Sequence, residues 1–229
     1  MKSVLVIIPA YNEQDNIKRV VDNLIKNYPQ YDYVVVNDGS KDNTKKICQE
    51  NGYRLLDLPV NLGLAGGFQA GMKYAYQKGY DYAIQFDADG QHRPEYIKDI
   101  LKKIEEGYDI VIGSRFVDQK KDSSLRMIGS RMIALAIKLT TGTKINDPTS
   151  GMRMFNKAMI KECAVNLNYG PEPDTVSYLV KNGAKVAEVQ VEMDERIAGE
   201  SYLNMMNSIK YMIRMLISIV VIQNFRKRG

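Results

Sequence analysis

Residues 82–92 read Tyr-Ala-Ile-Gln-Phe-Asp-Ala-Asp-Gly-Gln-His, a short apolar run followed by two closely spaced carboxylates. The run Tyr82–Phe86 predicts a buried strand, so Asp87 and Asp89 stand at its carboxyl end. Ligands of open α/β sheets bind at that edge, and hard oxygen ligands suit Mg²⁺ or Mn²⁺ together with substrate phosphates. We therefore expect Asp87 and Asp89 to bind a divalent metal, with Gln91 as a further oxygen ligand. An acidic surface turn would show the same Asp-x-Asp pattern.

Short apolar strands alternate with longer helical patterns outward from this stretch, as far as about residue 113. Such repeated units predict an α/β fold with a mainly parallel central sheet and helices on both faces. Ser40 is expected to cap the second helix, because its hydroxyl can accept a hydrogen bond from the first turn. The expected strands are Val4–Ile8, Tyr33–Val36, Tyr53–Leu56, Tyr82–Phe86 and Asp109–Ile112; the expected helices are Glu13–Asn27, Lys41–Glu50, one that follows the glycine-rich loop Asn61–Gly67 and ends at Tyr76, and one that begins near Pro94.

The pattern changes after Gly113, where the strand–helix units become less regular. We expect residues 1–113 to form a nucleotide-binding half and residues 114–202 an acceptor half of one domain. A C-terminal amphipathic helix is expected within residues 203–229. The elements expected in this second part are a helix over Ser124–Thr140, a strand over Met152–Phe155, a helix over Asp174–Lys181, a strand over Lys185–Val191 and a long helix from Tyr202 to about Phe225.

The net charge of the 229-residue chain is +5, from 32 Lys and Arg against 27 Asp and Glu, and its position matters more than its size. Residues 203–229 contain five basic residues and no acidic one, which equals the whole excess. The remainder is nearly neutral, which gives no indication of a nucleic-acid partner. The two cysteines, Cys48 and Cys163, exclude a disulfide framework and fit a reducing cytosol.

Six short motifs in order give the chain a resemblance to a known family. The first three resemble the family-2 glycosyltransferases of GT-A fold, and the last three narrow the resemblance to the dolichol-phosphate mannosyltransferase-like branch. Members of that branch load a sugar onto a polyprenyl phosphate. The resemblance covers roughly residues 3 to 202, and its motifs are Pro9-Ala10-Tyr11-Asn12-Glu13, Val36-Asn37-Asp38-Gly39-Ser40, Phe86-Asp87-Ala88-Asp89-Gly90-Gln91-His92, Gly113-Ser114-Arg115-Phe116, Asp147-Pro148-Thr149-Ser150-Gly151 and Arg196-x-x-Gly199-x-Ser201.

The resemblance implies a site for a nucleotide sugar with a UDP or GDP base. Asn37 stands where the family often has Asp, so the sequence leaves open which of Asn37 and Asp38 contacts the donor. A helix-capping segment at 9–13 and a tight turn at 37–39 are the alternative interpretations. The implied donor-binding residues are Pro9, Ala10, Tyr11, Glu13, Asn37, Asp38, Asn61, Gly63, Asp87, Ala88 and Asp89.

The acceptor implied by the resemblance is undecaprenyl or dolichyl phosphate. Arginine binds such a phosphate with a planar fork of donors, better than lysine does. The candidates are Arg115, Ser130, Arg131 and Arg196, with Arg126 in reserve. Tyr202 stands where the family often has a lysine, so one basic contact is missing or supplied elsewhere.

The implied reaction is metal-dependent transfer of a hexose or N-acetylhexosamine with inversion at the anomeric carbon. An ionised phosphate oxygen is already a nucleophile and requires no strong general base. Asp89 and Asp147 are the expected catalytic carboxylates, although Asp147 could be a turn residue. Glu172 and Asp174 are weaker candidates near the acceptor, and His92 is expected to support the metal site more than to bind the metal.

The C-terminal helix carries an apolar stripe, which core packing or a membrane surface could cover. Its basic charge favours the membrane, so we expect peripheral docking on the cytoplasmic leaflet through this helix and Leu125–Leu139. A small integral membrane protein or a second copy of the chain is an expected partner. The stripe consists of Leu203, Met206, Ile209, Ile213, Leu216, Ile217 and Val220.

Three other functions are compatible with parts of the sequence. A nucleotide-binding dehydrogenase should have Gly-x-Gly-x-x-Gly after its first strand, where Pro9–Glu13 stands instead. A noncatalytic membrane scaffold of the same fold would not need the Asp87/Asp89 pair. A glycosyltransferase acting on a carbohydrate or cell-wall polymer hydroxyl would need a clear base and would leave the arginine set without a use.

Overall fold

The computed structural model describes residues 2–119, 121, 124–166, 170–195 and 205–225. Its centre is a seven-stranded sheet in the order β3-β2-β1-β4-β6-β5-β7. Only β6 runs antiparallel to its neighbours β4 and β5, so the expected mainly parallel sheet is confirmed. The strands are β1 (Val4–Ala10), β2 (Asp32–Asp38), β3 (Leu55–Leu58), β4 (Tyr82–Gln85), β5 (Ile110–Ser114), β6 (Arg153–Asn156) and β7 (Val186–Gln190).

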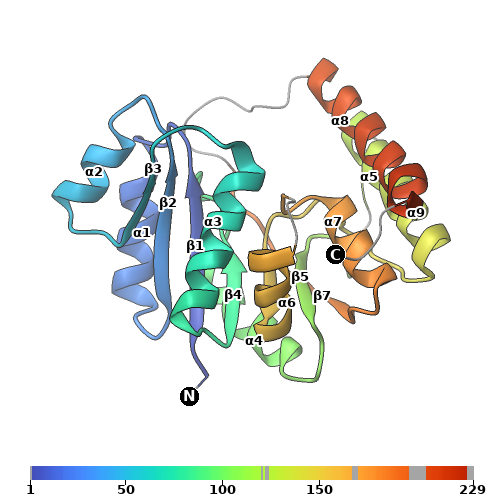
Figure 1. Ribbon diagram of the computed structural model, residues 1–229, viewed down its shortest axis with the longest axis horizontal. Coiled ribbons are helices and arrows are strands. Elements are labelled where there is room, and N and C mark those ends of the chain that lie inside the picture. Colours follow the sequence, from blue (N-terminus) through green and yellow to red (C-terminus); the bar gives the residue numbers. More distant parts are fainter. Residues whose placement is uncertain (1, 120, 122–123, 167–169, 196–204, 226–229) are drawn as a thin grey trace.

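Helices cover both faces of this sheet (Figure 1). One face is packed by α1 (Ile17–Asn27), α2 (Thr44–Glu50) and α4 (Ile97–Ile104), which follows a short 3₁₀ turn at Pro94–Tyr96. The other face is packed by α3 (Gly63–Lys78), α6 (Lys157–Lys161) with the π-helical turn Glu162–Asn166, and α7 (Pro173–Lys181). Beyond α7 lie α5 (Leu125–Thr141) and α8 (Met205–Ile217), which continues through the π turn Ser218–Ile222 into α9 (Gln223–Phe225).

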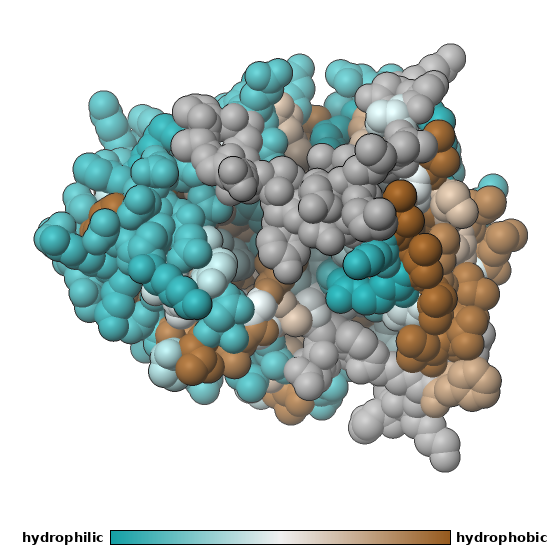
Figure 2. All heavy atoms as spheres, turned by 90° about the horizontal axis from the view of Figure 1, so that it is seen from above, coloured by the Kyte–Doolittle hydropathy of each residue, from teal (hydrophilic) through white to brown (hydrophobic). Residues whose placement is uncertain are grey.

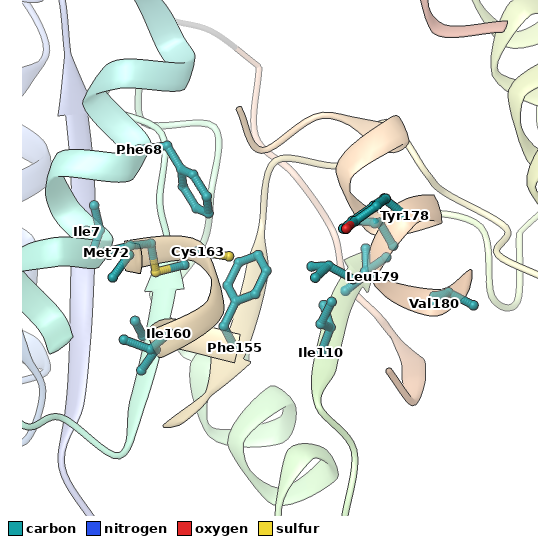
Figure 3. Packing of buried hydrophobic residues seen from close by; sticks show 14 of the residues in the cluster. Ile7, Phe68, Met72, Ile110, Phe155, Ile160, Cys163, Tyr178, Leu179 and Val180 are labelled. Atoms are coloured by element: carbon teal, nitrogen blue, oxygen red, sulfur yellow. The ribbon is translucent and has the colours of Figure 1, made fainter. Parts of the chain in front are cut away.

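The sheet joins the two parts that the sequence separates at Gly113. Strand β6, from the second part, lies between β4 and β5, and its Phe155 packs against Phe68 of α3 with ring centroids 5.6 Å apart (Figure 3). The thiol of Cys163 lies in the same core, and burial raises its pKa to about 12. Burial also raises the pKa of Cys48 to about 11, so neither thiol is ionised at neutral pH.

Two expectations about local structure are wrong, and one helical segment was not predicted. Ser40 does not cap α2: its Oγ accepts the backbone N–H of Asn12, and the side chain of Asp42 accepts the N–H of Thr44, where α2 begins. The glycine-rich loop is shorter than expected because α3 begins at Gly63. The helical segment from Lys157 to Asn166 was missed; Asn156 caps it by accepting the N–H of Met159 at 3.0 Å.

Helices α5 and α8 pack on each other and leave apolar side chains on their outer faces. A Cβ at Gly129 of α5 would overlap Met212 of α8, so this glycine allows the close approach. Met215 and Ile219 enter the core, whereas much of the expected apolar stripe stays exposed. Figure 2 shows these apolar side chains along one edge of the molecule. The exposed set is Ile128, Met132, Leu135 and Leu139 on α5 and Ile209, Ile213, Ile217, Val220, Val221, Ile222 and Phe225 near the C-terminus.

Of the helices in the described part of the chain, none combines the length and apolar character that a membrane span requires. The basic residues Arg226, Lys227 and Arg228 lie outside the described residues, as do Leu203 and the start of the expected helix at Tyr202.

Candidate functional site

The carboxyl ends of β1, β2 and β4 meet along one edge of the sheet, because these strands are parallel and in register. Ala10 at the end of β1 pairs with Asn37 near the end of β2, and Ile7 pairs with Gln85 at the end of β4. The ends of these strands and the loops that follow them contain Pro9–Glu13, Asn37–Asp38 and Asp87–Asp89, which we call the donor edge. The structure thus brings together segments that are far apart in the sequence.

Asp38 connects the donor edge to the loop before α3. Its Oδ1 accepts the N–H of Leu62 at 2.7 Å, and its backbone carbonyl accepts from the side-chain amide of Asn61 at 3.1 Å. Gly39 has a φ of +65°, and a Cβ there would lie 2.6 Å from the backbone N of Asn61. Only glycine fits this close approach, which brings Asn61, and Gly63 bonded to it, beside Asp38.

Asn37 lies inside the protein and is held by a neighbouring strand. Its side chain is buried and donates to Asp57 Oδ1 at 2.7 Å. Asp57 also forms an ion pair with Lys45 at 2.6 Å, and this lysine lowers the pKa of Asp57. The side-chain amide of Asn37 is therefore engaged in a contact inside the protein. Of the two residues, Asp38 is the one that contacts the segment before α3.

The Pro9–Glu13 loop is tied to the helices that follow it. Glu13 accepts the side-chain amide of Asn16 at 2.8 Å, and its backbone N–H donates to Thr44 Oγ1 of α2 at 2.8 Å. Asn12 has a left-handed φ of 56°, and its side chain accepts from the backbone of Lys41. The segment thus holds the start of α1 in place while Tyr11 remains exposed at the edge.

Two side chains, those of Gln85 and His92, contact Asp87 and fix its orientation. Gln85 donates its amide to Asp87 Oδ1 at 3.3 Å. His92 is buried, and its Nδ1 accepts the backbone N–H of Asp87 at 2.9 Å, so Nε2 faces Asp87 Oδ2 at 3.5 Å. The structure therefore places His92 in support of Asp87, and 39% of the Asp87 side chain remains exposed.

Asp89 and Gln91 complete the acidic turn. Asp89 Oδ1 accepts the N–H of Gln91 at 3.1 Å, and the side-chain amide of Gln91 donates to the backbone carbonyl of Asp194 at 3.3 Å. No group of three or more His, Cys, Asp or Glu side chains that could hold a metal occurs within the described residues. Two carboxylates suit a divalent ion that completes its coordination with water and substrate phosphates.

Gly151 makes room for the Asp87 carboxylate. A Cβ at this position would lie 2.8 Å from Asp87 Oδ2 and 3.3 Å from His92 Cε1. The glycine ends the Asp147–Gly151 loop, so this loop borders the donor edge directly. The Asp87 carboxylate is thus packed against Gly151 on one side while 39% of its side chain stays exposed, so it fits the role of an oxygen ligand for a divalent ion.

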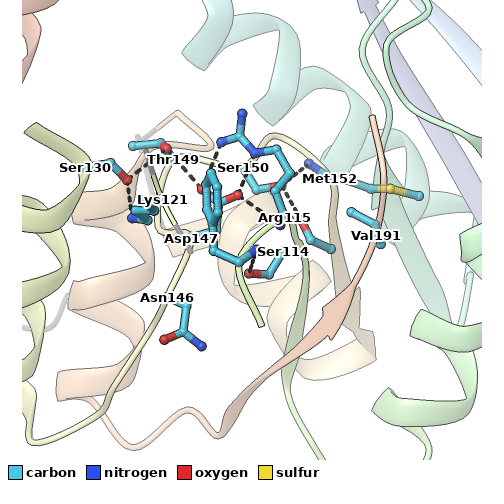
Figure 4. A network of polar contacts seen from close by, with 12 residues as sticks. Ser114, Arg115, Lys121, Ser130, Asn146, Asp147, Thr149, Ser150, Met152 and Val191 are labelled. Atoms are coloured by element: carbon cyan, nitrogen blue, oxygen red, sulfur yellow. Dashed lines mark hydrogen bonds and ion pairs between the residues drawn. The ribbon is translucent and has the colours of Figure 1, made fainter. Parts of the chain in front are cut away.

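The other end of the Asp147–Gly151 loop holds a buried ion pair (Figure 4). Asp147 is 0% exposed and accepts Nε and Nη2 of Arg115 at 2.7 and 2.9 Å. Burial alone would raise the pKa of Asp147, but the guanidinium and backbone N–H of Arg115, with Lys121 nearby, hold it below its ordinary value. Two predicted residues, one for catalysis and one for the acceptor, are thus bound to each other.

Glu188 and Gln190 of β7 fix the two segments that carry this pair. Glu188 accepts the N–H groups of Asn146 and Asp147 at 2.7 Å each. Gln190 accepts the N–H groups of Val117 and Asp118 and donates to the backbone carbonyl of Arg115. Sequence reasoning missed both residues, because nothing in their own segment indicates contacts more than 40 residues away.

Hydroxyl and amine groups extend the ion pair toward α5. Thr149 donates to Asp147 and lies 3.4 Å from Ser130 Oγ, and Lys121 Nζ donates to Ser130 Oγ at 2.7 Å. Arg131 donates to the backbone carbonyl of Lys121 at 2.6 Å. We call this set, Arg115, Lys121, Ser130, Arg131, Asp147 and Thr149, the acceptor network. It joins three of the four predicted acceptor residues and adds Lys121, which the sequence analysis missed.

Arg153 is a further residue that sequence reasoning missed. It connects the Asp147–Gly151 loop to the segment before α7. Its buried guanidinium donates to the backbone carbonyls of Pro148, Pro171 and Glu172. Burial lowers its pKa. Its position next to the Asp147–Gly151 motif was the only signal in the sequence.

Glu172 and Asp174 contact the C-terminal helices. Glu172 forms an ion pair with Arg214 at 2.5 Å, and Asp174 accepts Ser218 Oγ at 2.7 Å. Burial raises the pKa of Glu172, although Arg214 opposes the shift. These contacts hold α8 against α7, whereas Arg196 and the side chain of Arg126 lie outside the described residues.

Comparison with known proteins gives three consistent matches. Residues 5–164 match the sequence model of Glycosyl transferase family 2. The chain is 32% identical to the UDP-N-acetylglucosamine–dolichyl-phosphate N-acetylglucosaminyltransferase of Methanococcus voltae, over 83% of this chain and 85% of that protein. It is 30% identical to the undecaprenyl-phosphate mannosyltransferase of Micrococcus luteus, over 88% and 87%.

A solved structure of low sequence identity supports the fold. The glucosyl-3-phosphoglycerate synthase of Mycobacterium tuberculosis, in complex with Mn²⁺, UDP-glucose and phosphoglyceric acid, matches with a TM-score of 0.72 at 15% identity. The match covers 96% of this chain and 80% of that one. It confirms the expected GT-A-type α/β fold.

Proposed function

The chain belongs to glycosyl transferase family 2, and from this premise we propose that it transfers a hexose or N-acetylhexosamine from a UDP- or GDP-sugar to a polyprenyl phosphate. Undecaprenyl and dolichyl phosphate are the acceptors in the names of its relatives. One observation carries the proposal: a single loop, Asp147–Gly151, borders the Asp87 carboxylate at one end and binds Arg115 at the other. The donor and acceptor sites are therefore neighbours.

The donor edge supplies the binding surface for the nucleotide sugar. We assign Pro9, Ala10, Tyr11 and Asp38, with Asn61 and Gly63, to the donor because they lie at the carboxyl ends of β1 and β2 or in the segment bonded to Asp38. Mg²⁺ or Mn²⁺ bound by Asp87 and Asp89, with Gln91, would offset the charge of the leaving nucleoside diphosphate. His92 and Gln85 orient Asp87 for this role.

The acceptor network supplies the binding site for the phosphate. A phosphate monoester carries nearly two negative charges near neutral pH and binds well to an arginine fork. One phosphate oxygen attacks the anomeric carbon in line, and the new C–O bond forms as the bond between that carbon and the β-phosphate oxygen of the donor breaks. The electrons of the broken bond leave with the nucleoside diphosphate. No side chain needs to remove a proton from an ionised phosphate.

Asp147 serves this reaction by positioning Arg115. It is buried, and both of its oxygens already accept hydrogen bonds from Arg115. A carboxylate held in this way fixes the guanidinium in one orientation, which lowers the entropic cost of binding phosphate. Arg196 is a further acceptor residue in the proposal on sequence grounds.

The exposed faces of α5 and α8 suit peripheral docking on the cytoplasmic leaflet. Their apolar side chains would enter the lipid–water interface, and the basic C-terminal residues would meet anionic headgroups. This places the acceptor network next to the membrane that holds the polyprenyl phosphate. A small integral membrane partner or a second copy stays a prediction from the sequence.

The test is direct assay of the purified full chain. The protein is incubated with Mn²⁺ or Mg²⁺, a panel of UDP- and GDP-sugars and a short polyprenyl phosphate, and products are identified by mass spectrometry. We expect a glycosylated polyprenyl phosphate that disappears with EDTA and does not form with the matching polyprenol. Transfer to carbohydrate hydroxyls without any lipid product would contradict the proposal.

A further inference from the structure

We propose that Lys121 is a phosphate-binding residue of the acceptor site, acting beside Arg115 and Arg131. This inference rests on the proposed function and deepens it by naming a contact that the recognised motifs do not contain. Lys121 lies between Phe116 and α5, outside all six motifs.

The contacts of Lys121 place its ammonium group inside the acceptor network. Nζ donates to Ser130 Oγ at 2.7 Å, and the backbone carbonyl accepts from Arg131. Both the guanidinium carbon of Arg115 and Nζ of Lys121 lie 5.2 Å from the centroid of the Phe116 ring. Phe116 thereby makes a cation–π contact with each of the two positive groups.

The carboxylates nearest to Lys121 make their hydrogen bonds with other groups. Asp147 directs both oxygens to Arg115, and Glu188 directs both to backbone N–H groups. No carboxylate of the described residues forms an ion pair with the Lys121 ammonium. Burial lowers the pKa of Lys121; the charges of Asp147 and Glu188 offset this shift in part, whereas those of Arg115 and Arg131 add to it. A phosphate dianion would supply an anionic partner for the Lys121 ammonium.

The shape of the surroundings agrees with a lipid phosphate. Lys121 lines a cavity of about 440 Å³ together with Phe116, Arg131, Lys138 and Lys144, and none of the lining residues that the structure describes is acidic. Leu135 also lines this cavity, and Leu139, 77% exposed, follows one turn later on α5. The basic wall suits the headgroup, and the apolar α5 face suits the first isoprene units.

The experiment compares the full chain with Lys121→Ala, Lys121→Arg and, as a matched control, Lys98→Ala on the exposed side of α4. Steady-state rates are measured with a short polyprenyl phosphate at saturating nucleotide sugar, and then with the donor varied. Loss of a charge-assisted hydrogen bond predicts a KM for the lipid that is roughly 10- to 100-fold higher in Lys121→Ala. Lys121→Arg should recover most of the loss, and the donor KM should change little.

Binding and stability measurements exclude a purely structural role. Calorimetric titration should show a dissociation constant for the short polyprenyl phosphate that rises in Lys121→Ala in parallel with KM. The melting temperature should stay near that of Lys98→Ala. An unchanged lipid KM in Lys121→Ala would overturn the assignment alone. If the unsubstituted chain transfers sugar to no polyprenyl phosphate, the proposed function fails first, and this inference fails with it.

Discussion

The donor edge and the acceptor network both depend on an aspartate, but they use it in opposite ways. Asp87 keeps 39% of its side chain exposed and is oriented by Gln85 and His92. Asp147 is fully buried and bound by Arg115 through two hydrogen bonds. An open carboxylate can bind a ligand, whereas a buried and paired one can only position its partner. Burial and partners, rather than residue type, therefore separate a binding role from a supporting one.

The largest expected effect concerns the donor edge, where the carboxylates are partly exposed. Asp89→Ala should lower turnover by at least about 10³-fold, because it removes a proposed ligand of the metal ion. That ion would offset the negative charge that develops on the leaving nucleoside diphosphate. Metal-dependent nucleotide binding, followed by calorimetry with and without EDTA, should disappear with it. The melting temperature should hardly change, as for the exposed control Asp99→Ala. Full activity in Asp89→Ala would refute the metal assignment.

Substitutions in the buried Arg115–Asp147 pair should lower the stability of the protein as well as its activity. Arg115→Ala leaves Asp147 buried and unpaired, which should cost about 3–5 kcal/mol in the free energy of unfolding. Chemical denaturation at pH 7 measures the loss. Arg115→Lys should retain part of the stability but less of the acceptor binding, because an ammonium group cannot replace the two-pronged contact.

The pH dependence of this loss has a definite sign. The pKa of Asp147 in the folded state lies below its ordinary value of 3.8, so the ion pair stabilises the protein fully above that value. The contribution is lost as the pH falls through the folded-state pKa. The stability difference between the unsubstituted chain and Arg115→Ala should therefore be largest near neutral pH and shrink below about pH 4. A difference that grows in acid would contradict the pairing.

A substitution at Gly151 tests whether the donor edge and the acceptor network are separate sites. Gly151 belongs to the Asp147–Gly151 loop, whose other end binds Arg115, but it contacts Asp87 of the donor edge. Gly151→Ala adds a Cβ 2.8 Å from Asp87 Oδ2, and the backbone there is not left-handed, so the effect is steric. Displacing the carboxylate should lower kcat by about 10²-fold. The lipid KM should change far less than in Arg115→Ala. Unchanged kcat with a raised lipid KM would show that the loop serves the acceptor alone.

The comparison also explains which parts of the site the sequence could predict. Parallel strands place their carboxyl ends along one edge, so Asp38 and Asp87 could be assigned to a shared site from their positions after apolar runs. The pairing of Arg115 with Asp147 could not, because 32 residues separate them and only the tertiary fold brings them together. Lys121 and Glu188 are ordinary charged residues in their own segments. Their role depends on contacts from other elements.

The same limit applies to the fold. The strand–helix alternation predicts the parallel part of the sheet, but the antiparallel entry of β6 between β4 and β5 leaves no local mark in the sequence. The apolar residues of the C-terminal helix show the limit in another way, because the sequence predicts where the apolar residues lie but not what covers them. Its spacing predicts one apolar face, but the structure shows that Met215 and Ile219 enter the core while Ile213 and Ile217 face outward.

The smallest expected effect concerns the outer surface beside the acceptor network. Leu139→Ser combined with Ile213→Ser should lower binding to anionic vesicles at least about tenfold, since burying each side chain in lipid is worth about 1.5–3 kcal/mol. Flotation measures the bound fraction, and Ile25→Ser on α1, at the opposite face of the sheet, is the control. Removing residues 203–229 would be a poorer test, because Met215, Ile219 and Gln223 are buried and their loss would disturb α7. Equal flotation of the double variant and the control would show that this face does not meet the membrane.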